Sequence, residues 1–180
     1  MNFKSPTTVS LQAAFFFTLD PLLIIVFWKF YHPWVAYQRG KYFEFSLMAV
    51  HFLGLMYLVG FPVYFVSGWL ACIYMLGNFT LSHSHLPVAE EPTHWVEYAL
   101  CHTMNIEPSW WCDWWMGYLN YQIEHHLFPT MPQFRARLVQ DRVKALAKRH
   151  GIPFYSTSYW DAIRKTHRNL ANVAEEVKSQ

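Results

Sequence analysis

The stretch FSLMAVHFLGLMYLVGFPVYFVSGWLACIYMLGNFTLSHSHLPVA, residues 45–89, contains no charged side chain in 45 positions. A helix needs about 20 apolar residues to cross a bilayer, so this stretch is long enough for two crossings. Gly60 and Pro62 lie near its middle, and a proline tends to end a helix at the residue before it. The stretch therefore predicts an antiparallel pair of membrane helices at about 43–59 and 62–83.

Positive charge is distributed unevenly along the chain. No lysine or arginine occurs between Lys41 and Arg135, and 10 of the 14 lie after Pro132. Lysine and arginine accumulate on the cytoplasmic side of membrane proteins, so the segment that ends at Lys41 and the basic tail should both be cytosolic. A helical hairpin returns the chain to the side that it left, which places His83 on the cytosolic side as well.

The segment SLQAAFFFTLDPLLIIVFW, residues 10–28, is also long enough to span a membrane. Asp20 and Pro21 lie at its centre, where an ionised carboxylate is costly. We expect a broken helix in the interface, followed by a loop that carries Lys29, His32, Arg39 and Lys41. A third membrane span is the alternative.

Two segments after the hairpin have the composition of a membrane–water interface. Residues 92–105 predict a short surface helix with its aromatic side chains near the lipid headgroups. The segment PSWWCDWWMGYLNYQ, residues 108–122, is dense in tryptophan and tyrosine, as is typical of an aromatic belt. We expect one helix at 110–127 that ends before Pro129.

The basic C-terminal part has the pattern of soluble helices. A first helix should run from Pro132 to Gly151, since proline favours the first turn and glycine the end of a helix. A second helix is predicted at about 158–177, with Ser156 or Ser158 as its N-cap.

These patterns together predict an all-α protein with integral membrane helices. Residues 1–131 should form the membrane-embedded part, an antiparallel transmembrane hairpin plus interfacial helices, and residues 132–180 a cytosolic basic helical tail. The three cysteines form no Cys-x-x-Cys pair, which excludes a disulfide-rich secreted protein. We expect no nucleic-acid partner.

The segment NYQIEHHLFP, residues 120–129, carries the strongest candidate site. On a helix, Gln122, His125 and His126 share one face. Imidazoles without thiolates suit iron, zinc or copper, and the long gap in lysine and arginine favours a cation. A zinc protease is disfavoured because H-E-x-x-H is absent. Glu124 points away from this face, which suits a supporting or solvated carboxylate. The alternative is an interfacial helix with incidental histidines.

A second group of polar residues ends the second membrane helix, in GNFTLSHSHLP at 77–87. Polar residues gathered at one membrane depth usually face a cavity or one another. We expect at least one of His83 and His85 to be a metal ligand.

The segment NYQIEHHLFPTMP, together with GNFTLSHSHLP upstream, resembles the C-terminal part of a front-end fatty acid desaturase. In this family of membrane enzymes, histidine boxes hold two iron ions, and the third box reads Q-x-x-H-H. Gln122, His125 and His126 match that box residue by residue. The resemblance is strong from about residue 78 to 155 and weak from about residue 10.

The resemblance implies iron ligands. His125 and His126 would bind iron with Gln122 in the first position of the box, and a further ligand would come from the end of the preceding helix. The family's usual S-H or N-H at that point favours His83, whereas helical spacing favours His85, so both stay open.

The resemblance also implies an oxygen-dependent acyl-lipid or acyl-CoA desaturase that introduces a double bond into polyunsaturated fatty acyl chains. Such an enzyme would work with a di-iron centre in the endoplasmic reticulum membrane, among membrane lipid, with its site on the cytosolic side. Its electrons would come from a cytochrome-type haem protein and its reductase.

The family's two earlier boxes, H-x-x-x-H and H-x-x-H-H, and its haem-domain motif His-Pro-Gly-Gly do not occur in this sequence. We therefore expect this chain to be the C-terminal portion of a longer enzyme and to be inactive alone. The alternative is a truncated, non-catalytic membrane isoform that pairs with or regulates a full-length desaturase.

Overall fold

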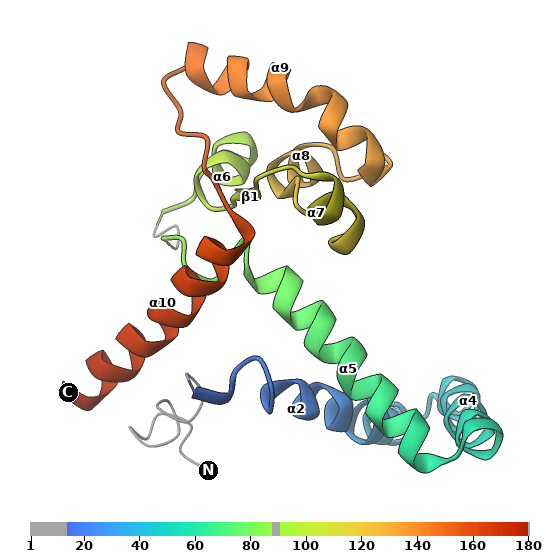
Figure 1. Cartoon of the computed structure of the whole chain (residues 1–180). Coiled ribbons are helices and arrows are strands. Elements are labelled where there is room, and N and C mark those ends of the chain that lie inside the picture. Colours follow the sequence, from blue (N-terminus) through green and yellow to red (C-terminus); the bar gives the residue numbers. More distant parts are fainter. Residues whose placement is uncertain (1–13, 88–90, 180) are drawn as a thin grey trace. The chain divides into compact units, whose positions relative to one another are not determined.

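The computed structural model describes residues 14–87 and 91–179, which are mostly helical, and the chain forms two compact units, Met1–Gly77 and Asn78–Gln180 (Figure 1). The elements in chain order are α2 (Asp20–Val26), η1 (Phe27–Tyr31), α3 (His32–Gln38), α4 (Tyr42–Val59), α5 (Phe61–Thr80), α6 (Trp95–Cys101), β1 (Asn105–Ile106), α7 (Trp110–Trp115), α8 (Gln122–Leu127), η2 (Gln133–Arg135), α9 (Ala136–Arg149), β2 (Ser156–Thr157) and α10 (Tyr159–Ser179).

Helices α2 and α3 are joined by η1, which is one wide turn of π-helix. The predicted interruption is present, because residues 16–19 form turns and α2 begins at Asp20 with Pro21 in its first turn. The predicted loop at His32 is wrong, because the backbone stays helical through η1 and α3. Pro33 is accommodated in the first turn of α3, directly after the wide π-turn.

Helices α4 and α5 have 18 and 20 residues and confirm the two apolar helices of membrane length. Few contacts join the two helices, so their antiparallel packing stays a prediction. Gly60 joins them with a φ of 78°, which glycine adopts without a steric cost. No residue of α4 is buried, and Asn78 is the buried residue of α5. Within residues 14–87 and 91–179, no other helix has the length and hydropathy of a membrane span. Residues 10–13 of the alternative third span lie outside the described residues.

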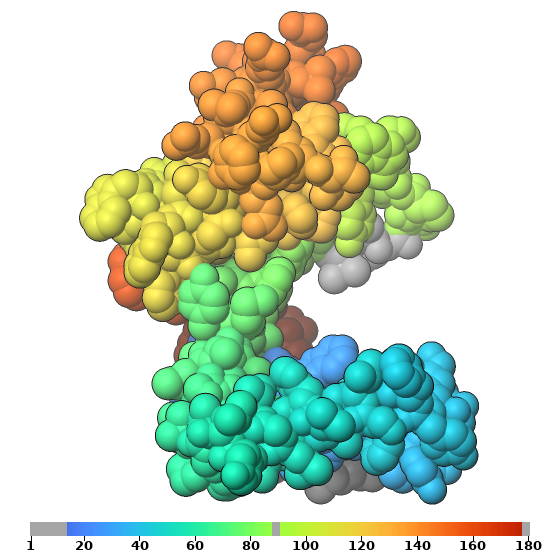
Figure 2. Space-filling model, turned by 90° about the vertical axis from the view of Figure 1, so that its right-hand side faces the viewer, coloured from blue at the N-terminus to red at the C-terminus, as the bar shows by residue number. Residues whose placement is uncertain are grey.

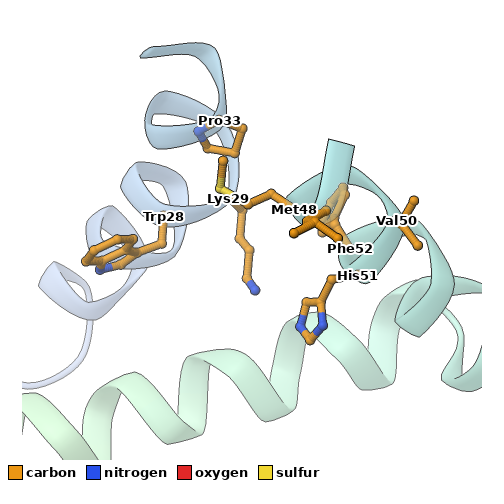
Figure 3. Close-up of a pocket in the computed structure, with 8 residues that line it drawn as sticks. Trp28, Lys29, Pro33, Met48, Val50, His51 and Phe52 are labelled. Carbon is orange, nitrogen blue, oxygen red and sulfur yellow. The ribbon is translucent and has the colours of Figure 1, made fainter. Parts of the chain in front are cut away.

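A hollow of about 590 Å³ lies between the η1–α3 segment and α4 (Figure 3). Its walls are mostly apolar, and the side chains of Lys29 and His51 point into the same space. The ammonium group of Lys29 lies 5.1 Å from the centroid of the Tyr64 ring, a cation–π contact. An amine and a single imidazole are too few donors for a metal, so this hollow is not a candidate metal centre.

In the second unit, helices α6, α8 and α9 share one apolar core. Their buried contact residues are small or aliphatic: Ala99, Leu100, Ile123, Leu127, Val143 and Ala147. Figure 2 shows these helices, coloured yellow-green to orange, packed into one continuous surface. The first helix of the basic C-terminal segment therefore packs directly on the helix that carries the Q-x-x-H-H residues.

A second core joins α7, α10 and the loops before them. Its buried members are Leu81, Met104, Ile106, Cys112, Met116 and Ala162. Beside it, β1 and β2 form a short parallel pair in which Asn105 is opposite Ser156 and Ile106 is opposite Thr157. This pair is the exception to the predicted all-α fold, since two residues are too few to show a strand period in sequence.

The predicted single helix at 110–127 is wrong, because the segment forms α7 and α8 with a turn between them. Gly117 and Tyr118 both have positive φ, 55° and 64°. A right-handed helix cannot continue through two left-handed residues. The Asn120 amide donates to Asp113 Oδ1 at 2.8 Å and closes the turn. The break leaves the Q-x-x-H-H residues on a helix of six residues.

Candidate metal centre

Three side chains from two distant segments meet at the start of α8. Gln122 Nε2 lies 3.1 Å from His83 Nε2 and 3.2 Å from His126 Nε2. The rings of His83 and His126 have centroids 5.3 Å apart and are nearly perpendicular, at 86°. The amide of Gln122 therefore stands between two imidazoles. We call these three side chains the His–Gln–His cluster.

Local structure explains how the cluster forms. Gln122 and His126 are four residues apart on α8 and so lie on the same face. His83 comes from the turns that follow α5, where the backbone carbonyl of Ser82 accepts a hydrogen bond from the N–H of Met104 at 3.1 Å. This backbone bond holds the turn in place so that the His83 ring reaches α8.

The pKa values of both imidazoles in the cluster are lowered. The amide nitrogen of Gln122 lies within hydrogen-bond distance of both Nε2 atoms, and each of them accepts from it only in the tautomer that leaves Nε2 unprotonated. Burial lowers the pKa of His83, and the charge of His125 lowers it further. Burial also lowers the pKa of His126, with His83 and His125 as smaller causes. A neutral imidazole is the form that binds metals.

His125 lies beside the cluster. Its ring centroid is 5.8 Å from that of His126, with an angle of 61° between the rings. Its Nδ1 is buried and has no hydrogen-bond partner among the described residues. A buried nitrogen without a partner costs free energy, and His125 Nδ1 shares this property with His85 Nε2.

His85 is directed elsewhere. Its Nδ1 lies 3.4 Å from Thr166 Oγ1 of α10, and its side chain lines a separate cavity next to that helix. Of the two histidines that end the α5 segment, the structure therefore brings His83 to Gln122 and places His85 against α10.

Glu124, a residue of α8, is completely buried, so the alternative of a solvated carboxylate is wrong. Its Oε2 accepts a hydrogen bond from Asn105 Nδ2 at 2.7 Å, while Asn105 Oδ1 accepts the backbone N–H of Ile123 at 2.9 Å. Burial raises the pKa of Glu124, and the bond from Asn105 opposes that change. Asn105 supports the first turn of α8. Sequence reasoning missed it because it lies 19 positions before Glu124 in no recognisable motif.

Asp113, one of the two carboxylates nearest the Q-x-x-H-H residues in the sequence, is a second supporting residue. Its carboxylate accepts hydrogen bonds from Asn120 Nδ2 at 2.8 Å and from the Tyr121 hydroxyl at 3.3 Å. Burial and the Asp113 carboxylate raise the pKa of Tyr121, so its hydroxyl remains a donor. Both bonds fix the residues just before α8 and therefore the position of Gln122.

The spacing within the cluster suits a metal ion. Metal–nitrogen bonds are about 2.1 Å long, so two ligand atoms on one ion lie about 3.0–3.4 Å apart. The separations of 3.1 and 3.2 Å from Gln122 Nε2 to the two histidine Nε2 atoms fall in this range, which is also the range of hydrogen bonds. A half-turn of the Gln122 amide puts its oxygen, the atom that binds metals, at the same position.

The ligand set is partial. In the described part of the chain, no three His, Cys, Asp or Glu side chains are grouped as a metal site. The cluster supplies two imidazoles and one carboxamide, with His125 next to them. The cluster and His125 therefore fit part of a metal centre, whose further ligands would come from outside α8 and the turn that carries His83.

Comparison with known proteins gives one consistent result. Residues 2–158 match the family model described as fatty acid desaturase. An acyl-lipid (8-3)-desaturase of Rebecca salina is 42% identical over 184 residues, covering 95% of this chain and 43% of the relative. A protein with the same description from Thraustochytrium sp is 41% identical, over 92% of this chain and 41% of the relative.

Another relative matches a shorter part of the chain. A delta(8)-fatty-acid desaturase of Borago officinalis is 36% identical over 104 residues, covering 56% of this chain and 23% of the relative. No solved structure matches. The chain thus spans about two-fifths of the length of the more similar relatives.

Proposed function

Because this chain belongs to the fatty acid desaturase family, we propose that it is the C-terminal portion of a front-end acyl desaturase. The substrate would be a polyunsaturated fatty acyl chain, and the reaction would remove two hydrogens with dioxygen to form a double bond. The observation that carries this proposal is the His–Gln–His cluster, in which the Q-x-x-H-H residues meet a histidine from the end of a membrane-length helix.

The cluster and His125 would hold iron. A bound pair of iron ions would supply the dioxygen activation that an unactivated methylene requires. This chain's residues would position the metals. His83 and His126 would supply imidazole nitrogens, and Gln122, which contacts both rings, would hold them in place. Asn105 and Asp113 fix α8 from behind. We assign the ligand position at the end of the α5 segment to His83, with His85 as the alternative.

We also propose that α4 and α5 cross the endoplasmic reticulum membrane as a hairpin, with the cluster and the C-terminal segment on the cytosolic side. The lack of burial along α4 supports this, since a helix that is apolar all round needs lipid or protein around it. Helices α6 and α7 would lie at the interface, because Trp95, Trp110 and Trp114 are 58%, 84% and 74% exposed.

The partial ligand set implies that this chain does not act alone. Further histidines would come from a preceding segment or another chain, and electrons from a haem protein and its reductase. The same observation supports the second candidate, a non-catalytic membrane isoform that pairs with a full-length desaturase.

Expression in yeast membranes distinguishes the desaturase portion from the non-catalytic isoform. The 180-residue chain and a version extended upstream with the missing histidine boxes would be assayed for iron and for new double bonds in fed polyunsaturated acids. We expect product from the extended chain alone. In that chain, His126→Ala should abolish product, whereas His150→Ala, a change at an exposed histidine of the C-terminal segment, should not. Product from the short chain, or turnover that survives His126→Ala, would contradict the proposal.

A further inference from the structure

A cavity of about 350 Å³ lies between α10 and the loop that follows α5. Its polar lining comes from three segments: His85 of that loop, Tyr155 before β2, and Lys165, Arg168, Asn169 and Asn172 of α10. All of these residues belong to the second unit. The cavity is separate from the His–Gln–His cluster, and no step proposed above uses it.

The four residues from α10 form one face of that helix. Lys165, Arg168, Asn169 and Asn172 are spaced i, i+3, i+4 and i+7, so they lie in a row along the cavity. Two cations and two carboxamides give this row many hydrogen-bond donors. Among the described residues that line the cavity, there is no carboxylate to neutralise the two cations.

Hydrogen bonds hold this face in place without using up its donors. Lys165 Nζ donates to Thr157 Oγ1 at 3.1 Å, which leaves two of the three ammonium protons available. Asn169 Nδ2 donates to the backbone carbonyl of Ser84 at 2.6 Å and ties α10 to the loop. The ammonium group is therefore positioned before any ligand arrives, and Arg168 lies next to it on the same face of α10.

Arg168 is suited to an oxyanion. A guanidinium offers a planar fork that matches two oxygens of a phosphate, and an ammonium adds a point charge beside it. The neighbouring arginine, Arg164, is instead paired with Asp161. The face thus keeps one arginine and one lysine at the cavity, and Asp161 is engaged by a different side chain.

We propose that this cavity binds a phosphate group through Lys165 and Arg168. His85 lines it and is two residues from His83, so the bound phosphate lies next to the loop that supplies the candidate metal centre. Resting on the proposed function, the phosphate belongs to the carrier of the acyl substrate, either a phospholipid headgroup or a soluble phosphate ester such as coenzyme A.

Residue-specific acetylation tests this without any desaturase activity. The 180-residue chain in phosphatidylcholine nanodiscs would be treated briefly with an acetylating reagent, and modification of Lys165, Lys144 and Lys148 followed by mass spectrometry. Pyrophosphate, coenzyme A or nanodiscs with added phosphatidic acid should slow acetylation of Lys165 and leave the other two lysines unchanged. Protection by the soluble compounds indicates a soluble carrier, and protection by phosphatidic acid alone indicates a lipid headgroup.

Two matched variants complete the test. Arg168→Gln should raise the ligand concentration needed for half-protection about tenfold, the size of one lost charge-assisted contact. Arg164→Gln removes the same charge from the same helix outside the cavity and should leave that concentration unchanged. Lack of protection of Lys165 by all three additives, or equal effects of the two variants, would overturn the phosphate site. Because no iron or turnover is involved, this result is independent of whether the chain takes part in desaturation.

Discussion

Asn105 is the residue on which the geometry of α8 depends most directly. Its side chain is fully buried and bonds to two consecutive residues of the helix, the backbone of Ile123 and the carboxylate of Glu124. A carboxyl group inside an apolar core is costly unless it is hydrogen-bonded. The amide of Asn105 therefore makes the burial of Glu124 possible and sets the first turn of the helix that carries Gln122.

Replacing Asn105 with alanine should lower the free energy of unfolding by about 2–4 kcal/mol, because a buried carboxyl oxygen and a buried N–H each lose a partner. Denaturant unfolding of the detergent-solubilised chain measures this. Gln133→Ala, at an exposed position of η2, is the matched control and should change stability by less than about 0.5 kcal/mol. Equal effects from the two variants would show that the Asn105 bonds do not stabilise the unit.

Cys112 should be a slow thiol in the folded protein. Burial, with a smaller effect of the Asp113 carboxylate, raises its pKa from 9.0 to about 11. At pH 8 the folded chain then holds about 100-fold less thiolate at this position than the unfolded chain, and thiolate is the reactive form. Alkylation followed by mass spectrometry should be correspondingly slower in the native state.

The raised pKa of Cys112 also determines how its contribution to stability and its alkylation rate depend on pH. The folded state holds this proton more tightly, so the stability from the protonated thiol is complete below pH 9 and is lost as pH rises from 9 towards 11. The alkylation rate should rise about tenfold per pH unit in this range. Native and denatured rates that agree at pH 8 would contradict a buried thiol.

At the scale of elements, the turn between α7 and α8 decides the site. The sequence predicted one helix at 110–127, and the relation of Gln122, His125 and His126 on one face survived because all three lie after the break. The prediction missed the turn between α7 and α8. The turn depends on left-handed conformations at Gly117 and Tyr118 and on a local bond between Asn120 and Asp113, and of these only the glycine is a stop signal that the sequence displays.

The start of α10 offers a direct test of a cap. Ser158 Oγ accepts the backbone N–H of Asp161 at 3.2 Å and donates to its carboxylate at 2.7 Å, so the two residues cap the helix together. Ser158→Ala should cost about 1 kcal/mol of unfolding free energy. Ser156→Ala is the control, because Ser156 is an exposed residue of β2. A larger loss at Ser156 would mean that the other predicted cap is the correct one.

Helices α4 and α5 predict a defined topology. With Cys72, Cys101 and Cys112 replaced by alanine, a single cysteine would be introduced at Val59 or at Ser156. In sealed microsomes, a membrane-impermeant maleimide should label Ser156→Cys directly, and Val59→Cys only after permeabilisation, because the hairpin turn faces the lumen. Labelling of both positions in sealed vesicles would contradict the hairpin.

At the scale of the whole molecule, the sequence predicted best the features that depend on one local pattern, such as a long uncharged stretch or a histidine motif. The uncharged stretch and Gly60 predicted α4 and α5 to within three residues at each end. The Q-x-x-H-H spacing indicated Gln122, His125 and His126 as candidate ligands. The contacts that join distant segments, such as β1 with β2, could not be predicted, because each depends on residues that have no local pattern.

The choice between His83 and His85 shows the same limit. Both are polar residues at the end of one apolar helix, and helical spacing favoured His85. The chain leaves the helix at Thr80 and continues as turns, so a helical period no longer applies there. Only the fold of the second unit brings His83 to Gln122 and His85 to Thr166.

Metal affinity of single-histidine variants tests the central claim most directly. Co²⁺, a redox-stable substitute for ferrous iron, would be titrated into the 180-residue chain in nanodiscs, with binding followed by its visible absorption. Relative to the unmodified chain, His83→Ala and His126→Ala should each weaken binding at least about tenfold, as expected when a ligand is lost. His85→Ala should leave the affinity unchanged. Weaker binding in His85→Ala with full affinity in His83→Ala would contradict the His–Gln–His cluster as the metal centre.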